Sequence, residues 1–146
     1  MASTVGPTFF EIADEEARAV LLRATVGRIA FTLHDRVDIE PIHFVTDGQW
    51  IFGRTSAGAK LSTLLHNPWC AFEVDEVRGL FDWSSVVVKG TFSLLDPMDS
   101  TGAYERAERL LTRLIGSTFT EHDPVPHRSI VFGIHVNELT GRTARP

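Results

Sequence analysis

The chain has 146 residues, the size of one domain, and 43% of them are hydrophobic, with ten Phe and three Trp among them. This composition excludes an intrinsically disordered chain. The net charge is −5 and the basic residues are scattered singly, which excludes a basic stripe for duplex nucleic acid. The longest apolar runs fall far short of the roughly 20 residues that span a membrane, so no membrane segment is expected.

The N-terminal region and the cysteine content indicate a compartment. Residues 1–16 have no basic start and no apolar stretch of the kind found in a secretory signal. Cys70 is the only cysteine, so the chain cannot form an internal disulfide. We therefore expect a soluble cytoplasmic protein.

The first third of the chain predicts one helix followed by two strands. Acidic residues at 14–16 and apolar residues at helical spacing predict a helix over residues 14–24. Residues 28–33 alternate apolar and polar side chains, which is the period of a strand. A second strand is expected over 37–46. Pro41 in its middle lacks the N–H group that a ladder needs, so this strand should lie at an edge or carry a bulge.

The middle of the chain predicts a hairpin and a short helix. Asp47 and Gly48 form a strong turn signal, and residues 49–53 return as a third strand. Leucines at helical spacing then predict a helix whose first turn contains Lys60. Pro68 ends this helix by restricting the residue before it.

The second half of the chain predicts three more strands and a longer helix. Residues 69–75 and 84–95 alternate apolar and polar side chains and are expected to be strands. A stripe of apolar residues at helical spacing predicts a helix over 99–115. Residues 129–136 alternate again, and the polar residues 137–146 are expected to form a tail.

Six alternating strands and three helices make the predicted fold mainly β. Alternation favours an antiparallel sheet with one buried face. Six such strands with few crossover helices close most readily into a small barrel. We predict a single domain over residues 1–146, built as a six-stranded antiparallel β-barrel with flanking helices.

The segment RTSAGAK, residues 54–60, joins the third strand to the short helix and has the composition of an anion site. It is not a Walker A motif, because the lysine comes one position late after Gly53 and Gly58 and no Ser or Thr follows it. Free N–H groups at a helix start, hydroxyl groups and basic side chains would still converge here, as at a phosphate site. The residues concerned are Arg54, Thr55, Ser56 and Lys60. Ordinary capping of the helix by Ser56, with Lys60 in solvent, explains the same spacing.

Metal binding and nucleophilic catalysis have weaker signals. No two of the six His residues have the i, i+4 spacing of a helical metal site, although His122 and His127 share a loop with Asp123. Cys70 lies on the apolar face of a predicted strand, which favours a buried inert thiol over a nucleophile. The Gly-x-Ser-x-Gly sequence of serine hydrolases is not present. We expect no metal site.

Two long patterns resemble a known family. Residues 27–92, from GRIAF through DIEPIHFVTDGQWIFGRTSAGAKLSTLLHNPWCAFEVDE to WSSVVVKGTF, are similar to the flavin-binding split-barrel superfamily typified by pyridoxamine 5'-phosphate oxidase. Residues 131–142, VFGIHVNELTGR, resemble the small nitroimidazole-resistance-like branch of that superfamily. The most specific parts are a Pro-x-x-apolar strand, a Lys-Leu-x-x-Leu-x-x-Asn-Pro helix and a Ser-Val-x-x-x-Gly strand.

The resemblance implies a homodimer of split barrels with FMN at each end of the dimer interface. Lys60 would hold the FMN phosphate with residues 54–56 beside it, and backbone groups of residues 41–43 would face the flavin ring. Ser85 would make a polar contact to FMN, and Trp83 would lie beside it at the dimer seam. The implied cofactor residues are Pro41, Ile42, His43, Arg54, Thr55, Ser56, Lys60, Trp83 and Ser85.

Some positions allow other interpretations. Ser85 could be an ordinary outward strand residue, and Trp83 could simply pack in the interface. Val87 is an apolar residue on the outward face of the same strand, which independently suggests a partner surface. A barrel of this size is also too small to enclose a flavin ring without a second copy.

The resemblance leaves the reaction and the exact cofactor open. Residues 137–146 lack the Arg- and His-bearing substrate motif of true pyridoxamine phosphate oxidases, and Gly53 and Arg54 stand where nitroimidazole-resistance proteins tend to carry a His. A deazaflavin or haem is compatible with the fold. The first hypothesis is a flavin-dependent oxidoreductase for a small molecule, with His43 either the proton donor or a packed strand residue. The second is a flavin- or haem-binding protein that stores or senses without turnover.

Overall fold

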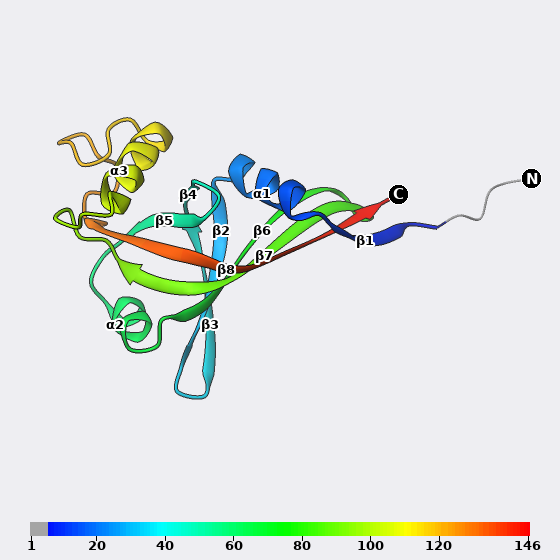
Figure 1. Ribbon diagram of the computed structural model, residues 1–146, viewed down its shortest axis with the longest axis horizontal. Coiled ribbons are helices and arrows are strands. Elements are labelled where there is room, and N and C mark those ends of the chain that lie inside the picture. Colours follow the sequence, from blue (N-terminus) through cyan, green and yellow to red (C-terminus); the bar gives the residue numbers. More distant parts are fainter. Residues whose placement is uncertain (1–5) are drawn as a thin grey trace, which may run out of the picture.

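A computed structural model describes residues 6–146, and one curled antiparallel sheet dominates it (Figure 1). The strand order is β3-β2-β6-β7-β8-β5-β4, and β1 pairs with β8 outside this path. The strands are β1 (Thr8–Ile12), β2 (Val26–Leu33), β3 (Arg36–His43), β4 (Val45–Thr46), β5 (Trp50–Thr55), β6 (Trp69–Gly79), β7 (Asp82–Leu94) and β8 (Ile130–Arg145). The helices are α1 (Asp14–Arg23), α2 (Ala59–His66) and α3 (Ala103–Leu114). The predicted class, a mainly β antiparallel barrel with three helices, is confirmed.

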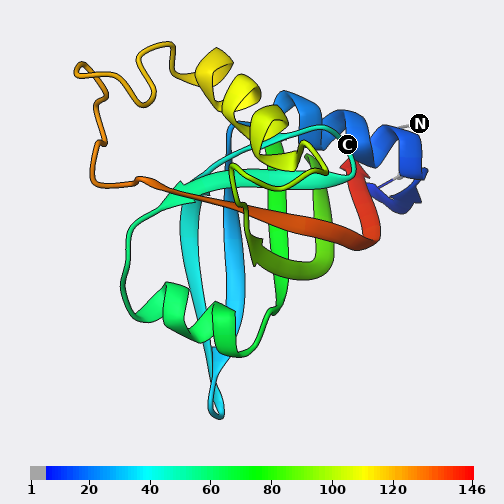
Figure 2. The same cartoon turned by 60° about the vertical axis from the view of Figure 1, so that its left-hand side comes forward.

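The core lies on the inner face of the curled sheet, where β5 and β8 cross over β2 and β3 (Figure 2). The alternating residues of the predicted strands supply it, as their period of two requires. Its fully buried strand residues include Ile29, Ile51, Phe72, Val74, Val86, Val88 and Ile134. Leu21 from α1 and Leu64 from α2, both fully buried, close its two sides. Burying each of these large side chains contributes roughly 1.5–3 kcal/mol.

The prediction of a polar C-terminal tail over residues 137–146 is wrong, because β8 continues to Arg145. Its second half pairs with β7 on one side and with β1 on the other. Thr143 is fully buried and its hydroxyl donates to the carbonyl of Trp83 at 2.9 Å, so a polar residue completes the sheet here. Gly141 sits where an added Cβ would lie 2.5 Å from Ile12, so this strand packs directly against β1.

The predicted edge strand is confirmed, although it is shorter than expected. Pro41 lies in β3 at the end of the sheet path, opposite Arg28 of β2. The chain leaves β3 at Phe44 and resumes as the two-residue strand β4, so the segment predicted as one strand is two. The described residues form eight strands, two more than the six expected. One addition is β4, from this division, and the other is β1.

Local turn and helix signals account for the remaining elements. Gly48 adopts a φ of 91° in the predicted hairpin, and the Asp47 carboxylate accepts N–H bonds from the next turn residues at 2.8–2.9 Å. Helix α3 begins at Ala103 instead of residue 99, because Gly102 before it has a left-handed φ of 75°. Among residues 6–146, no helix is long and apolar enough to cross a membrane.

Candidate functional site

A polar cavity of about 220 Å³ lies where the end of β3 meets the β5–α2 connection. We call it the polar cavity. Its lining residues are Glu40, Pro41, Ile42, His43, Arg54, Thr55, Ser56, Lys60, His127 and Arg128. All the cofactor residues predicted from the sequence line it except Trp83 and Ser85.

Helix α2 begins at this cavity without a side-chain cap. Gly58 is the N-cap residue and has extended backbone angles, and no side chain bonds to the first-turn N–H groups. Ser56 lies two residues earlier and is exposed, so the interpretation of Ser56 as a capping residue is wrong. The start of α2 therefore presents N–H groups and a positive dipole end to the cavity.

Lys60 reaches across the cavity toward β3. Its Nζ lies 3.0 Å from Oε2 of Glu40, and only 24% of its side chain is exposed. The alternative in which Lys60 is freely solvated is therefore wrong. The pair is partly exposed, so it contributes little to stability by itself, but it fixes the ammonium group at the cavity wall.

Arg54 lines the cavity, yet most of its donors are used elsewhere. Its guanidinium forms an ion pair with Asp123 at 2.5 Å, and the two side chains are 6% and 2% exposed. Its Nε donates to the carbonyl of Arg128 at 2.9 Å, and the group lies 4.5 Å from the ring centroid of Phe119. Arg54 thus attaches the loop between α3 and β8 to β5.

The carboxylate of Asp123 is the anchor of that loop. Besides Arg54, it accepts backbone N–H bonds from Phe119 at 2.8 Å and Val125 at 3.0 Å. The hydrogen bond from Arg54 is the main reason why the pKa of Asp123 lies well below its usual range. The carboxyl group is therefore ionised at neutral pH.

Three residues of the cavity were not predicted as cofactor residues from the sequence. Glu40 directly precedes the predicted residues of β3. His127 and Arg128 come from the α3–β8 loop, more than sixty residues after Lys60, and only the fold brings them there. Arg128 is half-buried and forms no ion pair within the described residues 6–146. The weak sequence lead for a metal in this loop has no support, because the described part of the chain contains no group of three potential ligands.

His43 ends β3 with its side chain exposed at the cavity. The alternative in which it is a packed strand residue is therefore wrong. Ile42 beside it is 8% exposed and points into the core, so the two neighbours alternate as strand residues must. An imidazole exposed at a cavity can donate a hydrogen bond to a bound molecule or accept one from it.

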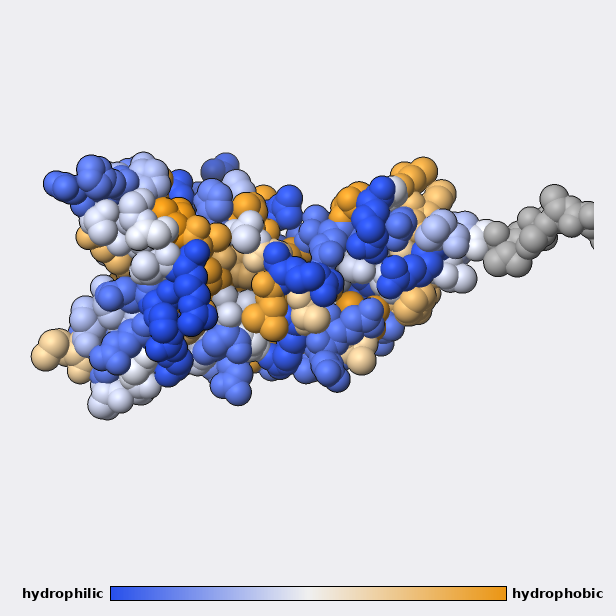
Figure 3. All heavy atoms as spheres, turned by 90° about the horizontal axis from the view of Figure 1, so that it is seen from above, coloured by the Kyte–Doolittle hydropathy of each residue, from blue (hydrophilic) through white to orange (hydrophobic). Residues whose placement is uncertain are grey.

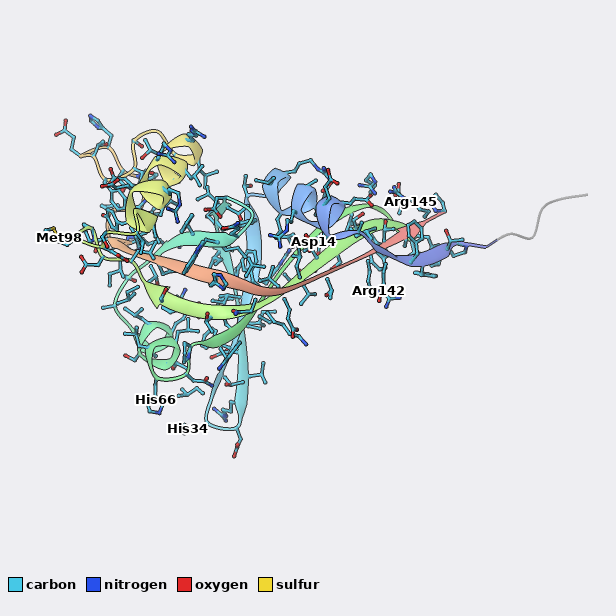
Figure 4. All side chains as sticks on the ribbon, in the orientation of Figure 1. Asp14, His34, His66, Met98, Arg142 and Arg145 are labelled. Atoms are coloured by element: carbon cyan, nitrogen blue, oxygen red, sulfur yellow. The ribbon has the colours of Figure 1, made fainter. Side chains whose placement is uncertain are left out.

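Trp83 and Ser85 lie at the other end of the molecule. Ser85 pairs with Arg142 of β8, which Figure 4 labels far from His66 at the end of α2. The Ser85 hydroxyl donates to Glu73 at 3.0 Å, while burial raises the pKa of that carboxyl group above its usual value. Within one chain the structure therefore does not bring these residues to the polar cavity.

A second cavity, of about 290 Å³, adjoins the polar one. We call it the apolar cavity. Its lining residues are His43, Arg54, Leu111, Leu114, Ile115, Thr118, Pro124, Val125 and Arg128. The two cavities share His43, Arg54 and Arg128, so a bound molecule could contact both.

Comparison with known proteins gives the family. The family model described as pyridoxamine 5'-phosphate oxidase matches residues 13–143, which is most of the chain. The chain belongs to the pyridoxamine 5'-phosphate oxidase family. This result confirms the superfamily that the sequence patterns resemble.

Several solved structures have a similar fold. An FAD-binding protein from Mesorhizobium loti superposes with a TM-score of 0.80 at 23% identity, covering 97% of this chain and 100% of that one. A proposed pyridoxamine 5'-phosphate oxidase from Corynebacterium glutamicum has a TM-score of 0.70 at 26% identity, with 94% and 98% covered. A proposed 5-nitroimidazole antibiotic resistance protein from Bacteroides thetaiotaomicron has a TM-score of 0.73 at 17% identity, with 96% and 90% covered.

Proposed function

We propose that the polar cavity binds the phosphate of a flavin nucleotide, FMN, and that the protein is a flavin-dependent oxidoreductase for a small molecule. The observation that carries the proposal is the convergence of an uncapped helix start, the hydroxyl-bearing residues Thr55 and Ser56, and the cations Lys60 and Arg128 on one cavity. These are the groups that recognise a phosphate. Family relatives described as FAD-binding support a flavin, and FAD carries the same phosphate as part of a pyrophosphate.

The charges of the cavity fit an anion. Lys60 is balanced by Glu40 and Arg54 by Asp123, whereas Arg128 has no carboxylate partner in the described chain. The wall therefore carries an excess positive charge before any ligand binds. A charge-assisted hydrogen bond to a phosphate contributes on the order of 1.5–3 kcal/mol, so two or three such contacts would supply a large share of the roughly 8 kcal/mol that micromolar binding requires.

The chain's own residues would position the flavin and protonate the substrate. A bound flavin supplies the hydride chemistry, and the protein supplies orientation, hydrogen bonds and exclusion of water. Residues 41–43 form the wall next to the phosphate contacts, so the proposal places the flavin ring against this strand end. His43 is the proton donor of the proposal, because its imidazole is exposed to both cavities.

The proposal includes a homodimer formed through the outer face, by which we mean the side of β3, β2, β6 and β7 that carries Ile39, Ala30, Ala71 and Val87. Strand pairing places Ala30 opposite both Ile39 and Ala71, which makes an apolar row across three strands. Ile39 is 65% exposed, and Pro41 of the polar cavity lies two residues further along β3. A partner on this face would therefore reach the cofactor site.

More apolar surface lies where β1 meets the β6–β7 turn (Figure 3). Phe9, Val77 and Leu80 there are 52–82% exposed. In the proposed dimer, this end of one protomer lies beside the polar cavity of the other, so that Trp83 and Ser85 of the second copy complete the site.

The test is the spectrum and activity of the purified protein. FMN bound to the protein gives absorption near 450 nm and fluorescence that changes on binding, and the proposal expects oxidation of NADH or NADPH in the presence of a small acceptor. A haem spectrum, or a preference for a deazaflavin, would contradict the cofactor. Tight FMN binding without turnover of any acceptor would favour storage or sensing over catalysis.

A further inference from the structure

The apolar cavity adjoins the polar cavity, and most of its wall takes no part in the proposed phosphate contacts. We propose that it is the substrate site, and that its ligand is a compact neutral ring compound with a carbonyl or nitro oxygen. This inference rests on the proposed function, because it assumes that the flavin lies in the adjoining polar cavity.

The walls of the cavity set the size and polarity of the ligand. Leu111, Leu114 and Ile115 come from the end of α3, and Pro124 and Val125 from the loop that follows it. Sites for drug-sized ligands start at about 300 Å³ and are lined mainly by apolar side chains. At about 290 Å³, the cavity therefore has room for one or two fused rings and favours an apolar body.

The cavity is held open by polar contacts behind its wall. The buried Arg54–Asp123 ion pair fixes the loop, and the Thr118 hydroxyl donates to the carbonyl of Ile115 at 2.6 Å. These contacts fix the loop to β5 and fix the turn that follows α3, and both segments form walls of the cavity. A pre-formed cavity loses little conformational freedom when a ligand binds.

The polar groups of the cavity select a neutral acceptor. His43 and Arg128 lie on the border with the polar cavity and can each donate a hydrogen bond to an oxygen atom. Arg54 has most of its donors occupied by the loop. A phosphorylated substrate would bring two charges against apolar walls with a single uncommitted cation, which is costly.

The boundary between the two cavities is also a suitable place for electron transfer from the flavin to the ligand. A ring bound there would lie next to the flavin proposed for the polar cavity, with His43 in contact with both. Hydride transfer from a flavin reduced by NADH or NADPH to the carbonyl carbon or nitro nitrogen would place negative charge on the oxygen that accepts the hydrogen bond from His43. That oxygen would then take the proton of His43, and the flavin would be left oxidised. The site therefore explains why this histidine is exposed.

The experiment uses the full chain and a fluorescent probe, 6-propionyl-2-(dimethylamino)naphthalene, which is a neutral two-ring ketone whose emission shifts to the blue in apolar surroundings. Probe binding is titrated with and without saturating FMN. Leu114→Trp narrows the cavity from α3, and Val125→Phe narrows it from the loop. The matched control is Arg113→Trp, which places the same side chain on the exposed side of α3.

We expect both narrowing variants to bind the probe at least tenfold more weakly, while Arg113→Trp binds it as wild type does and all variants bind FMN equally. Unchanged probe affinity in both narrowing variants would overturn the proposal. Displacement of the probe by AMP or FAD, but not by FMN, would also overturn it, because the cavity would then hold the adenosine half of a dinucleotide. Loss of FMN binding in wild type would contradict the proposed function instead, and the titration without FMN would still report on the cavity.

Discussion

Arg54 and Asp123, 69 positions apart in the chain, form a buried ion pair that joins β5 to the loop carrying His127 and Arg128. The pair holds two walls of the site together, because Arg54 lies near the end of β5 at the polar cavity while Asp123 anchors the loop around the apolar one. Neither side chain needs to touch a ligand for the site to depend on both. This arrangement makes Arg54 a positioning residue in the proposed function.

Asp123→Ala should lower the melting temperature by several degrees and weaken FMN binding. The change leaves the Arg54 guanidinium buried without its partner, which is a strongly destabilising outcome. Thermal unfolding monitored by circular dichroism measures the first effect and flavin fluorescence the second. Glu108→Ala, at an exposed position of α3 whose carboxylate has no hydrogen-bond or ion-pair partner among residues 6–146, is the control and should change neither. A variant with wild-type melting would contradict the role assigned to the pair.

The same pair predicts how stability depends on pH. The pKa of Asp123 is depressed in the folded state, so its contribution is fully present above the unfolded value of about 3.9 and is lost as pH falls toward the folded value. Between about pH 5 and pH 3, wild type should lose more stability than Asp123→Asn. Urea unfolding at a series of pH values tests this, and parallel curves for the two proteins would contradict it.

Cys70 should be inert in the folded protein. Its side chain is buried and burial raises the pKa of the thiol to about 12, so the thiolate is scarce at neutral pH. A disulfide reagent such as dithionitrobenzoate should react over hours in native buffer and within seconds in guanidinium chloride. Rapid reaction of the native protein would contradict this prediction and would support a nucleophilic Cys70.

The dimer predicted for the outer face should depend on Ile39. Ile39→Asp places a carboxylate in the apolar row, so sedimentation velocity should show monomers where wild type gives dimers. Its affinity for FMN should fall as well, because the proposed site uses both copies. Leu65→Asp, on the exposed side of α2, serves as the control for an added charge. Wild-type protein that is monomeric and still binds FMN would contradict the shared site.

Glu40→Gln should tighten FMN binding severalfold. The carboxylate lies 3.0 Å from the Lys60 ammonium and would repel a phosphate placed there, whereas the neutral amide can still accept a hydrogen bond. The measurement is the FMN affinity of wild type and Glu40→Gln at two salt concentrations. The gain in affinity should shrink at high salt, because screening weakens the repulsion between Glu40 and the phosphate. Weaker binding by Glu40→Gln would mean that this carboxylate contacts the ligand favourably.

Much of the fold could be predicted because its signals are local. Alternation identified β2, β6, β7 and the first part of β8, and Asp47-Gly48 marked the turn that leads into β5. The second half of β8 was missed because its sequence is polar and its stability comes from pairing with β7 and β1, which are remote in sequence. A strand that is held on both sides does not need an apolar pattern of its own.

The residues of the candidate site, too, could be predicted only where their signals are local in the sequence. The residues of the β5–α2 connection were found because they lie within one short segment, and the family resemblance added those of β3. No signal in the sequence indicated that His127 and Arg128 belong to this site, since the ion pair that places them joins residues far apart in the chain. Arg54 was assigned to the phosphate from its position alone, and only the structure reveals how many of its donors are committed to the loop.

The central claim is that Lys60 binds the phosphate of the flavin, and flavin fluorescence titration of Lys60→Ala tests it most directly. The account predicts that FMN binds roughly ten- to a hundredfold more weakly, because one charge-assisted contact of about 1.5–3 kcal/mol is lost. Riboflavin, which has no phosphate, should bind both proteins poorly and equally. Ser62→Ala, at an exposed position of the same helix, should bind FMN like wild type. FMN binding by Lys60→Ala at wild-type affinity would contradict the account.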